Sequence, residues 1–316
     1  MASNLAFVFP GQGSQQLGML AELAERYAVV RATFEEASAV LGYDLWQLVQ
    51  EGPVEQLNQT DQTQPALLAA SVAIWRVWKE LEGAPPAWLA GHSLGEYSAL
   101  VCSGALDFAD GLRLVRKRGE LMQAAVPAGE GAMAAILGLG AEEVEQACTS
   151  AAQGEVVQPV NYNAPGQIVI AGSTAAVERA IAACQAAGAR KAMPLPVSVP
   201  SHCELMRPAA EELAAELARI QLNKPRVPVV QNVHAQPESD VNVIRAHLVE
   251  QLFRPVRWIE CVEYMAAQGV DTYVECGPGK VLIGLNKRIV KNAKSLAVND
   301  PDSVMSALDL FRVEAE

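Results

Sequence analysis

A serine set between two glycines is the first group in this sequence that could do chemistry. Gly91-His92-Ser93-Leu94-Gly95 fits the pattern G-x-S-x-G, in which a strand turns sharply into a helix and exposes a serine hydroxyl. The flanking positions need residues without a Cβ, and the start of the next helix favours a developing oxyanion. Ser93 is therefore a candidate nucleophile. The alternative is an ordinary polar residue in a strand-to-helix turn.

A serine nucleophile needs a base, and the sequence contains four histidines. His92 is next to the serine, and neighbours in a tight turn point apart, so we expect it to shape the turn. His247 is expected on the surface of a helix. His234, at the end of a strand, stays possible, and His202 has the best local case.

The local case for His202 rests on a helix start. Ser201 and Glu204 have the spacing of a capping box, which would place His202 at the first helical position. There the helix dipole disfavours the imidazolium and keeps the ring ready to accept a proton. Pro208 conflicts with this, because it would break the helix unless residues 202–207 form an irregular turn. An ordinary loop histidine is the alternative.

One arginine lies on the wrong face of its helix. The helix predicted over 108–124 has a polar stripe, whereas Arg118 falls among Leu114, Leu121 and Met122 on the apolar face. A buried guanidinium is costly without an anionic partner. Two interpretations stay open: a structural ion pair with a buried Asp or Glu, or a clamp for a substrate carboxylate.

Strands and helices alternate along most of the chain, as a parallel α/β sheet requires. We expect a strand at 5–9, a helix beginning at Pro65, a strand at 86–91 and a helix at 94–106. Near the C-terminus, 271–285 repeats the order strand, glycine turn, helix. These elements predict a large α/β domain, similar to an α/β hydrolase, that carries the serine turn.

The middle of the chain follows a different order. Residues 128–197 predict strand, helix, strand, strand, helix and strand, which is the ferredoxin-like arrangement. We therefore expect a small domain at 128–197 inserted into a large domain formed by 1–127 and 198–316. The cleft between them is a favoured place for a ligand.

Composition limits the function classes. The 316 residues are 51% hydrophobic and 19% charged, as in a globular protein with a core, and the net charge of −12 argues against general nucleic-acid binding. The stretch 280–294 contains five basic residues and no acid. With Lys287, Arg288 and Lys291 it is either a solvated helix face or a docking patch for an acidic partner.

The remaining composition indicates a compartment. The six cysteines show no C-x-x-C spacing, which is typical of reduced thiols in a cytosol rather than of disulfides or a metal site. We find neither a signal peptide nor an apolar run long enough to span a membrane, and expect a cytoplasmic protein.

Seven motifs occur in one order along the chain: FPGQGSQ, TQPALLAASVAIW, GHSLGEYSAL, RLVRKRG, PVNYNAPGQIVIAG, VPSHCELM and VECGPGKVL. With them the sequence resembles the malonyl-CoA:acyl carrier protein transacylase family over essentially its whole length. The resemblance implies transfer of malonyl from coenzyme A to the phosphopantetheine thiol of an acidic acyl carrier protein. It implies no permanently bound cofactor or metal, and we expect a monomer.

The resemblance also assigns roles to residues. It implies Ser93 as nucleophile, His202 as general base and Arg118 as the holder of the malonyl carboxylate. The backbone N–H groups of Gln12 and Leu94 would form the oxyanion hole.

Three further positions follow from the same motifs. The resemblance implies that the main-chain oxygen of Gln251 orients the histidine. Asn161 and Asn163 are possible contacts beside the histidine or in the pocket, as is His92.

Other readings stay open at this point. A serine esterase or thioesterase shares the serine turn, and an α/β binding module without activity could contain it too. The sequence does not decide between a fatty acid and a polyketide pathway. It does not show how strictly methylmalonyl is rejected, although the resemblance favours plain malonyl.

Overall fold

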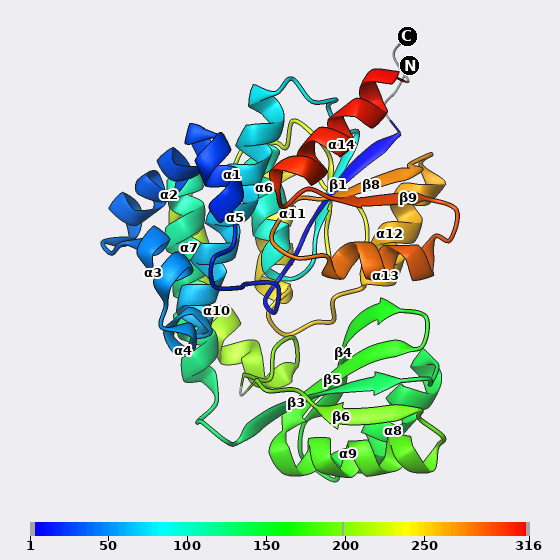
Figure 1. The fold of residues 1–316 in the computed structure, drawn as a ribbon. Coiled ribbons are helices and arrows are strands. Elements are labelled where there is room, and N and C mark those ends of the chain that lie inside the picture. The colour runs from blue at the N-terminus through cyan, green and yellow to red at the C-terminus, as the bar shows by residue number, and fades with distance from the viewer. Residues whose placement is uncertain (1–3, 198, 314–316) are drawn as a thin grey trace.

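Two separate sheets organise the chain, one parallel and one antiparallel (Figure 1). The computed structural model describes residues 4–197 and 199–313. Within that part of the chain, no helix is both long enough and apolar enough to cross a membrane.

The parallel sheet lies in the centre of the larger part of the molecule. Its strands, in spatial order, are β7 (Val229–Val230), β2 (Trp88–Gly91), β1 (Leu5–Phe9), β8 (Thr272–Glu275) and β9 (Lys294–Ala297). Side chains of a strand alternate between faces, so the apolar run of β1 serves two cores. Phe7 packs edge-on against Trp75 and Trp78 on one face, whereas Ala6 and Val8 belong to the core on the other face.

Helices cover both faces of this sheet (Figure 1). In chain order the helices of this larger part are α1 (Ala21–Arg26), α2 (Ala28–Leu41), α3 (Leu45–Glu51), α4 (Val54–Leu57), α5 (Thr60–Glu80), α6 (Leu94–Cys102), α7 (Phe108–Ala125), α10 (Arg207–Arg219), α11 (Val241–Glu250), α12 (Trp258–Ala267), α13 (Val281–Ile289) and α14 (Pro301–Val313). The core against α5 and α6 is the larger one, and α12 and α13 pack on the opposite face. This is the parallel α/β arrangement expected from the sequence.

Helix α5 begins earlier than the sequence predicts. The expected start at Pro65 is wrong, because the helix begins at Thr60 and contains the proline. The added turn is held by tertiary contacts: the Thr60 N–H donates to Gln123 Oε1 of α7 at 3.0 Å, and the Thr63 hydroxyl donates to the carbonyl of Leu57 at 2.5 Å. A proline near a helix start removes few backbone bonds, so such contacts suffice.

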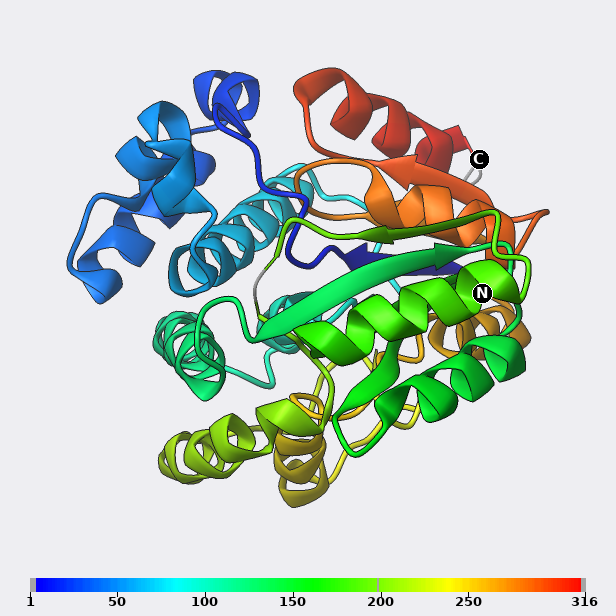
Figure 2. The same cartoon turned by 90° about the horizontal axis from the view of Figure 1, so that it is seen from below.

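The antiparallel sheet has the element order expected for a ferredoxin-like unit. Its strands, in spatial order, are β4 (Val157–Ala164), β5 (Gln167–Ser173), β3 (Gly131–Leu137) and β6 (Lys191–Pro194), with α8 (Ala141–Ala152) after β3 and α9 (Thr174–Ala186) after β5. Figure 2 shows α8 and α9 covering the outer face of this sheet. Met133 and Val169 lie on the inner face and line a pocket. The domain limits stay a prediction, and the expected boundary at 198 lies outside the described residues.

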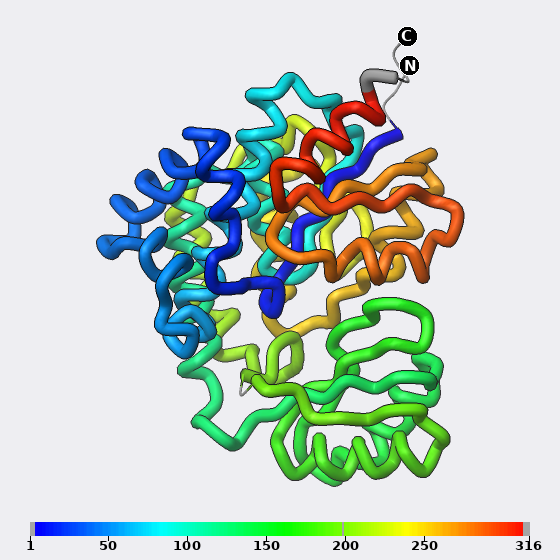
Figure 3. Tube along the Cα trace, viewed as in Figure 1, coloured from blue at the N-terminus to red at the C-terminus, as the bar shows by residue number. Residues whose placement is uncertain are grey.

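The chain enters the antiparallel sheet after α7 and returns from β6 to α10, as the trace in Figure 3 shows. Strand β4 joins the two parts: the Tyr162 N–H donates to the Val256 carbonyl at 3.0 Å, and the Val256 N–H donates to the Val160 carbonyl at 2.8 Å. The segment before α12 thus acts as a short extra strand beside β4. The pocket is formed between the two parts.

Candidate active site

The serine turn has the strained geometry that its motif predicts. Ser93 follows β2 and precedes α6, with φ 53° and ψ −112°. A Cβ on Gly91 would lie 1.9 Å from the carbonyl carbon of Gly95, and one on Gly95 would lie 2.0 Å from the Phe9 oxygen. Glycine is therefore required at both positions for the strand and the helix to approach. The turn presents the serine hydroxyl to a pocket of about 480 Å³.

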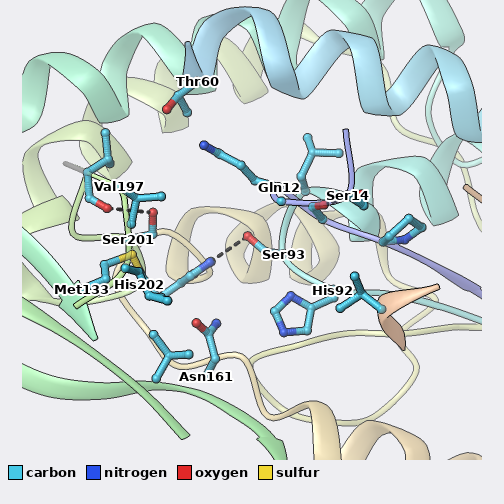
Figure 4. Close-up of a pocket in the computed structure, with 18 of the residues that line it drawn as sticks. Gln12, Ser14, Thr60, His92, Ser93, Met133, Asn161, Val197, Ser201 and His202 are labelled. Atoms are coloured by element: carbon cyan, nitrogen blue, oxygen red, sulfur yellow. Dashed lines mark hydrogen bonds between the residues drawn. The ribbon is translucent and has the colours of Figure 1, made fainter. Parts of the chain in front are cut away.

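His202 faces the hydroxyl (Figure 4). Ser93 Oγ and His202 Nε2 are 2.7 Å apart, and His202 Nδ1 lies 2.6 Å from the main-chain oxygen of Gln251. A carbonyl can only accept, so Nδ1 carries the proton and Nε2 is free to accept the serine proton. The partner of this histidine is thus the backbone oxygen that the sequence comparison implies, and not a carboxylate.

Burial, more than a helix start, keeps this imidazole neutral. Only 3% of the surface of His202 is exposed, and burial, with a further effect of the nearby Arg118 charge, lowers its pKa to about 3. The expected capping box is wrong. His202 has φ 66°, a short 3₁₀ turn begins only at Glu204, and that carboxylate binds Arg207. Helix α10 then starts at Arg207 with Pro208 in its first turn, where proline is tolerated.

Arg118 lines the same pocket as Ser93 and His202. Its side chain is 1% exposed. Nη1 donates to Gln64 Oε1 at 2.8 Å, and Nη2 donates to Gln251 Oε1 at 3.0 Å and to Ser93 Oγ at 3.3 Å. These partners are uncharged, so the expected alternative of a direct ion pair with a buried acid is not what the described residues show. The buried Nε has no hydrogen-bond partner among them.

The N–H groups expected to bind an oxyanion lie beside the serine. Leu94 is the first residue of α6, where backbone N–H groups have no acceptor within the helix. Gln12 lines the same pocket from the loop after β1, as Figure 4 shows. In the described part of the chain neither N–H makes a hydrogen bond. Both remain free to donate to a bound oxygen.

The possible pocket residues lie on the other side of the serine (Figure 4). His92 Nε2 is 2.7 Å from Asn163 Oδ1, and both line the pocket together with Asn161. Burial lowers the pKa of His92, so its ring is neutral. His92 therefore links the serine turn to β4 of the antiparallel sheet. His234, the other candidate base, does not line the pocket, and its Nε2 lies 3.4 Å from Glu250 Oε2.

Sequence reasoning missed three polar residues of the site. Gln64 holds Arg118, Asn232 Oδ1 accepts from the Ser93 N–H at 2.8 Å, and the buried Glu96 binds Asn232 and Gln251. The one available signal is that Glu96 directly follows the serine motif and is acidic within an otherwise buried helix.

The three basic residues expected to contact an acidic partner differ in their surroundings. Arg288 donates to Gln167 Oε1 at 2.5 Å and to the Pro165 carbonyl at 2.7 Å, so it fastens α13 to the β4–β5 turn. Lys287 and Lys291 are exposed. The first residues of α13 line the pocket, and the two exposed lysines lie toward and beyond the other end of the same helix.

The comparisons with known proteins agree with this geometry. Residues 6–304 match the model of the acyl transferase domain. This protein belongs to the acyl transferase family. The malonyl CoA-acyl carrier protein transacylase of Escherichia coli K12 is 61% identical to this acyltransferase over 308 residues, which cover 98% of this chain and 100% of that one.

Two solved structures have the same fold. An acyl carrier protein S-malonyltransferase from Vibrio cholerae has a TM-score of 0.95 and 64% identity, covering 96% of this chain and 99% of that one. A malonyl-transacylase in complex with its type II polyketide acyl-carrier protein has a TM-score of 0.97 and 60% identity, covering 98% and 100%. Both structures therefore match this acyltransferase over nearly its whole length.

Proposed function

We propose that this protein transfers malonyl from malonyl-CoA to the phosphopantetheine thiol of acyl carrier protein, through a malonyl ester on Ser93. The observation that carries the proposal is the guanidinium of Arg118 at 3.3 Å from a serine hydroxyl already hydrogen-bonded to a neutral histidine. A nucleophile, a base and a buried cation in one pocket fit an acyl group that ends in a carboxylate.

The first half-reaction loads the serine. His202 Nε2 takes the Ser93 proton as the serine oxygen attacks the thioester carbonyl, and the N–H groups of Gln12 and Leu94 receive the oxyanion. The tetrahedral intermediate collapses with cleavage of the C–S bond, and the imidazolium returns its proton to the coenzyme A sulfur. The malonyl carboxylate is held by Arg118, whose Nε is unpartnered among the described residues.

The second half-reaction transfers malonyl from Ser93 to the carrier protein. The carrier thiol gives its proton to His202 and attacks the ester, and collapse of the new intermediate returns the proton to Ser93. A backbone oxygen at Nδ1, in place of a carboxylate, stabilises the imidazolium less. We propose that this protects the ester from water until a thiol arrives.

The positive charge of Arg118 favours a malonyl group over a neutral acyl group in two ways. An acetyl group leaves the buried guanidinium without its anion, which is costly. The Arg118 charge also lowers the pKa of His202, so an acyl carboxylate that neutralises this charge makes the imidazole a better base.

We place this reaction in fatty acid synthesis, in the cytoplasm, by a monomer without a permanently bound cofactor. The curated relative named above supports the malonyl and carrier-protein substrates, and the complex with a polyketide carrier protein shows that a close structural neighbour binds such a partner.

Mass spectrometry of the intact protein tests the proposal. Incubation with malonyl-CoA is expected to add one malonyl group, on Ser93, which holo acyl carrier protein then removes. The Ser93→Ala variant provides the control and should stay unlabelled. A wild-type protein that stays unlabelled would contradict the proposal, and malonate release at the same rate with and without carrier protein would indicate a hydrolase instead.

A further inference from the structure

Glu96 is a carboxylate sealed inside the protein next to the serine turn, with 1% of its surface exposed. Its Oε2 accepts from the backbone N–H of Asn232 at 2.9 Å and from Gln251 Nε2 at 3.0 Å, and its Oε1 accepts from Gln231 Nε2 at 3.2 Å. Burial raises the pKa of Glu96 to about 7, and these donors act against the rise. Because all three partners are donors, the carboxylate is placed to act as an acceptor.

An acceptor of this kind fixes the direction of the neighbouring amide. Gln251 must turn its NH₂ group toward Glu96, and the same group donates to the Ser93 carbonyl at 3.0 Å. The amide oxygen then points the other way, where it accepts from Arg118 Nη2 at 3.0 Å. The orientation of one amide thus depends on an acid at one end and a cation at the other.

Glu96 holds Asn232 through its backbone and not through its side chain. With its N–H bound to Glu96, its Oδ1 accepts from the Ser93 N–H at 2.8 Å and its Nδ2 donates to the Gly91 carbonyl at 2.7 Å. Both backbone polar groups of Ser93 are therefore bound by side-chain amides from remote segments. Such support is needed because the turn has a φ of 53°, which L residues rarely adopt.

We propose that Glu96 is a positioning residue of the reaction: it anchors the backbone of Asn232 and orients the amide of Gln251, so that both side chains hold the Ser93 backbone and the Gln251 oxygen is directed to Arg118. Glu96 does not touch the substrate. The inference adds this residue to the function proposed above and rests on it.

The rate at which Ser93 is modified tests the inference. It is measured per labelled serine at pH 8.5 for two reactions: acylation by malonyl-CoA with loss of coenzyme A, and phosphonylation by a neutral fluorophosphonate with loss of fluoride. Glu96→Met has similar length but no acceptor, and it should slow both reactions about tenfold or more with full final labelling. Glu96→Gln keeps one oxygen, enough for Asn232 and Gln251. The amide of Gln231 can turn over toward the new NH₂ group, because His247 Nδ1, 2.7 Å from Gln231 Oε1, can then accept from the Gln231 NH₂ group in its other tautomer. The Glu96→Gln variant should stay within about threefold of wild type.

Two further variants complete the set. Gln231→Met removes the donor to Oε1 and leaves the bonds to Asn232 and Gln251, so it is expected to behave like wild type. Glu96→Asp keeps the charge but withdraws the acceptor by one methylene group. It should be slower than Glu96→Gln, and it serves as the second variant if Glu96→Met fails to fold.

Each other outcome would overturn the inference. Wild-type rates in Glu96→Met would show that the contacts are dispensable. A Glu96→Gln variant slower than Glu96→Asp would show that charge, and not hydrogen bonding, matters. If Glu96→Met lowered the number of labelled serines but not the rate per serine, or if Gln231→Met lost as much rate as Glu96→Met, Glu96 would have a general packing role. The fluorophosphonate rates keep this test separate from the proposed function, which is tested on the wild-type protein by labelling with malonyl-CoA and by the effect of carrier protein on malonate release.

Discussion

Replacing Arg118 by alanine removes the cation proposed to hold the acyl carboxylate. A bidentate contact between arginine and a carboxylate supplies two charge-assisted hydrogen bonds, each worth about 1.5–3 kcal/mol. Losing both costs about 3–6 kcal/mol, which is about 10²- to 10⁴-fold in the rate of acylation by malonyl-CoA. Acetyl-CoA makes neither bond, so its rate should not fall for this reason.

A second effect of the same substitution favours neutral acyl groups. After burial, the Arg118 charge is the next cause that lowers the pKa of His202. Without the guanidinium this pKa rises, and the imidazole becomes a stronger base at neutral pH. Ser93 Oγ keeps its 2.7 Å contact with His202 Nε2 when the longer 3.3 Å bond from Arg118 is lost, and Glu96 still binds the amide of Gln251. The acetyl-CoA rate should therefore stay level or increase.

Stopped acylation reactions followed by intact-protein mass spectrometry measure both rates. Arg118→Met fills the space that alanine leaves empty and should show the same change of preference, whereas Lys117→Ala, on the exposed side of α7, should keep wild-type rates. Thermal unfolding checks that each variant is folded. An Arg118→Ala variant that keeps malonyl acylation within about tenfold of wild type would refute the reasoning, because two charge-assisted bonds cannot be worth so little.

Two further predictions concern pH and partner binding. The pKa of His202 falls from 6.5 to about 3 on folding. The folded protein therefore has its full free energy of unfolding above pH 6.5 and loses part of it as the pH falls toward 3, because the unfolded state then binds a proton that the folded state excludes. Urea unfolding at pH 7 and 4.5 should show about 3 kcal/mol more acid destabilisation in wild type than in His202→Asn; equal losses would contradict the assignment. Charge reversal at Lys287 and Lys291 should raise the KM for carrier protein and leave that for malonyl-CoA unchanged, while equal increases would indicate a folding defect. Arg288 is unsuitable for this test, because it binds Gln167 within the protein.

The catalytic candidates could be predicted because each breaks a local rule. Ser93 sits between two glycines that a close approach of backbones requires, and Arg118 lies on the apolar face of an amphipathic helix. Such conflicts between a residue and its surroundings are the places where function is expected. The helix at 108–124 was predicted to within one residue of the observed α7, because its polar and apolar faces are distinct.

Other features could not be predicted from local sequence patterns. His202 was a good candidate for a wrong reason: burial and a neighbouring cation, and not a capped helix start, lower its pKa. The start of α5 depends on Gln123, which is far away in the chain. The amide network around Glu96 joins segments whose spacing shows no periodicity, so the local sequence could indicate Glu96 itself, as an acid in a buried helix, but not its partners.

By itself the sequence determined the elements and the kinds of chemical group: the order of strands and helices, a serine in a glycine turn, and a buried arginine. Periodicity and glycine placement encode these locally. Only the tertiary structure decided which histidine meets the serine, that a backbone oxygen orients it, and that neutral amides separate Arg118 from Glu96. These contacts join residues up to 158 positions apart, and folding alone brings them within hydrogen-bond distance.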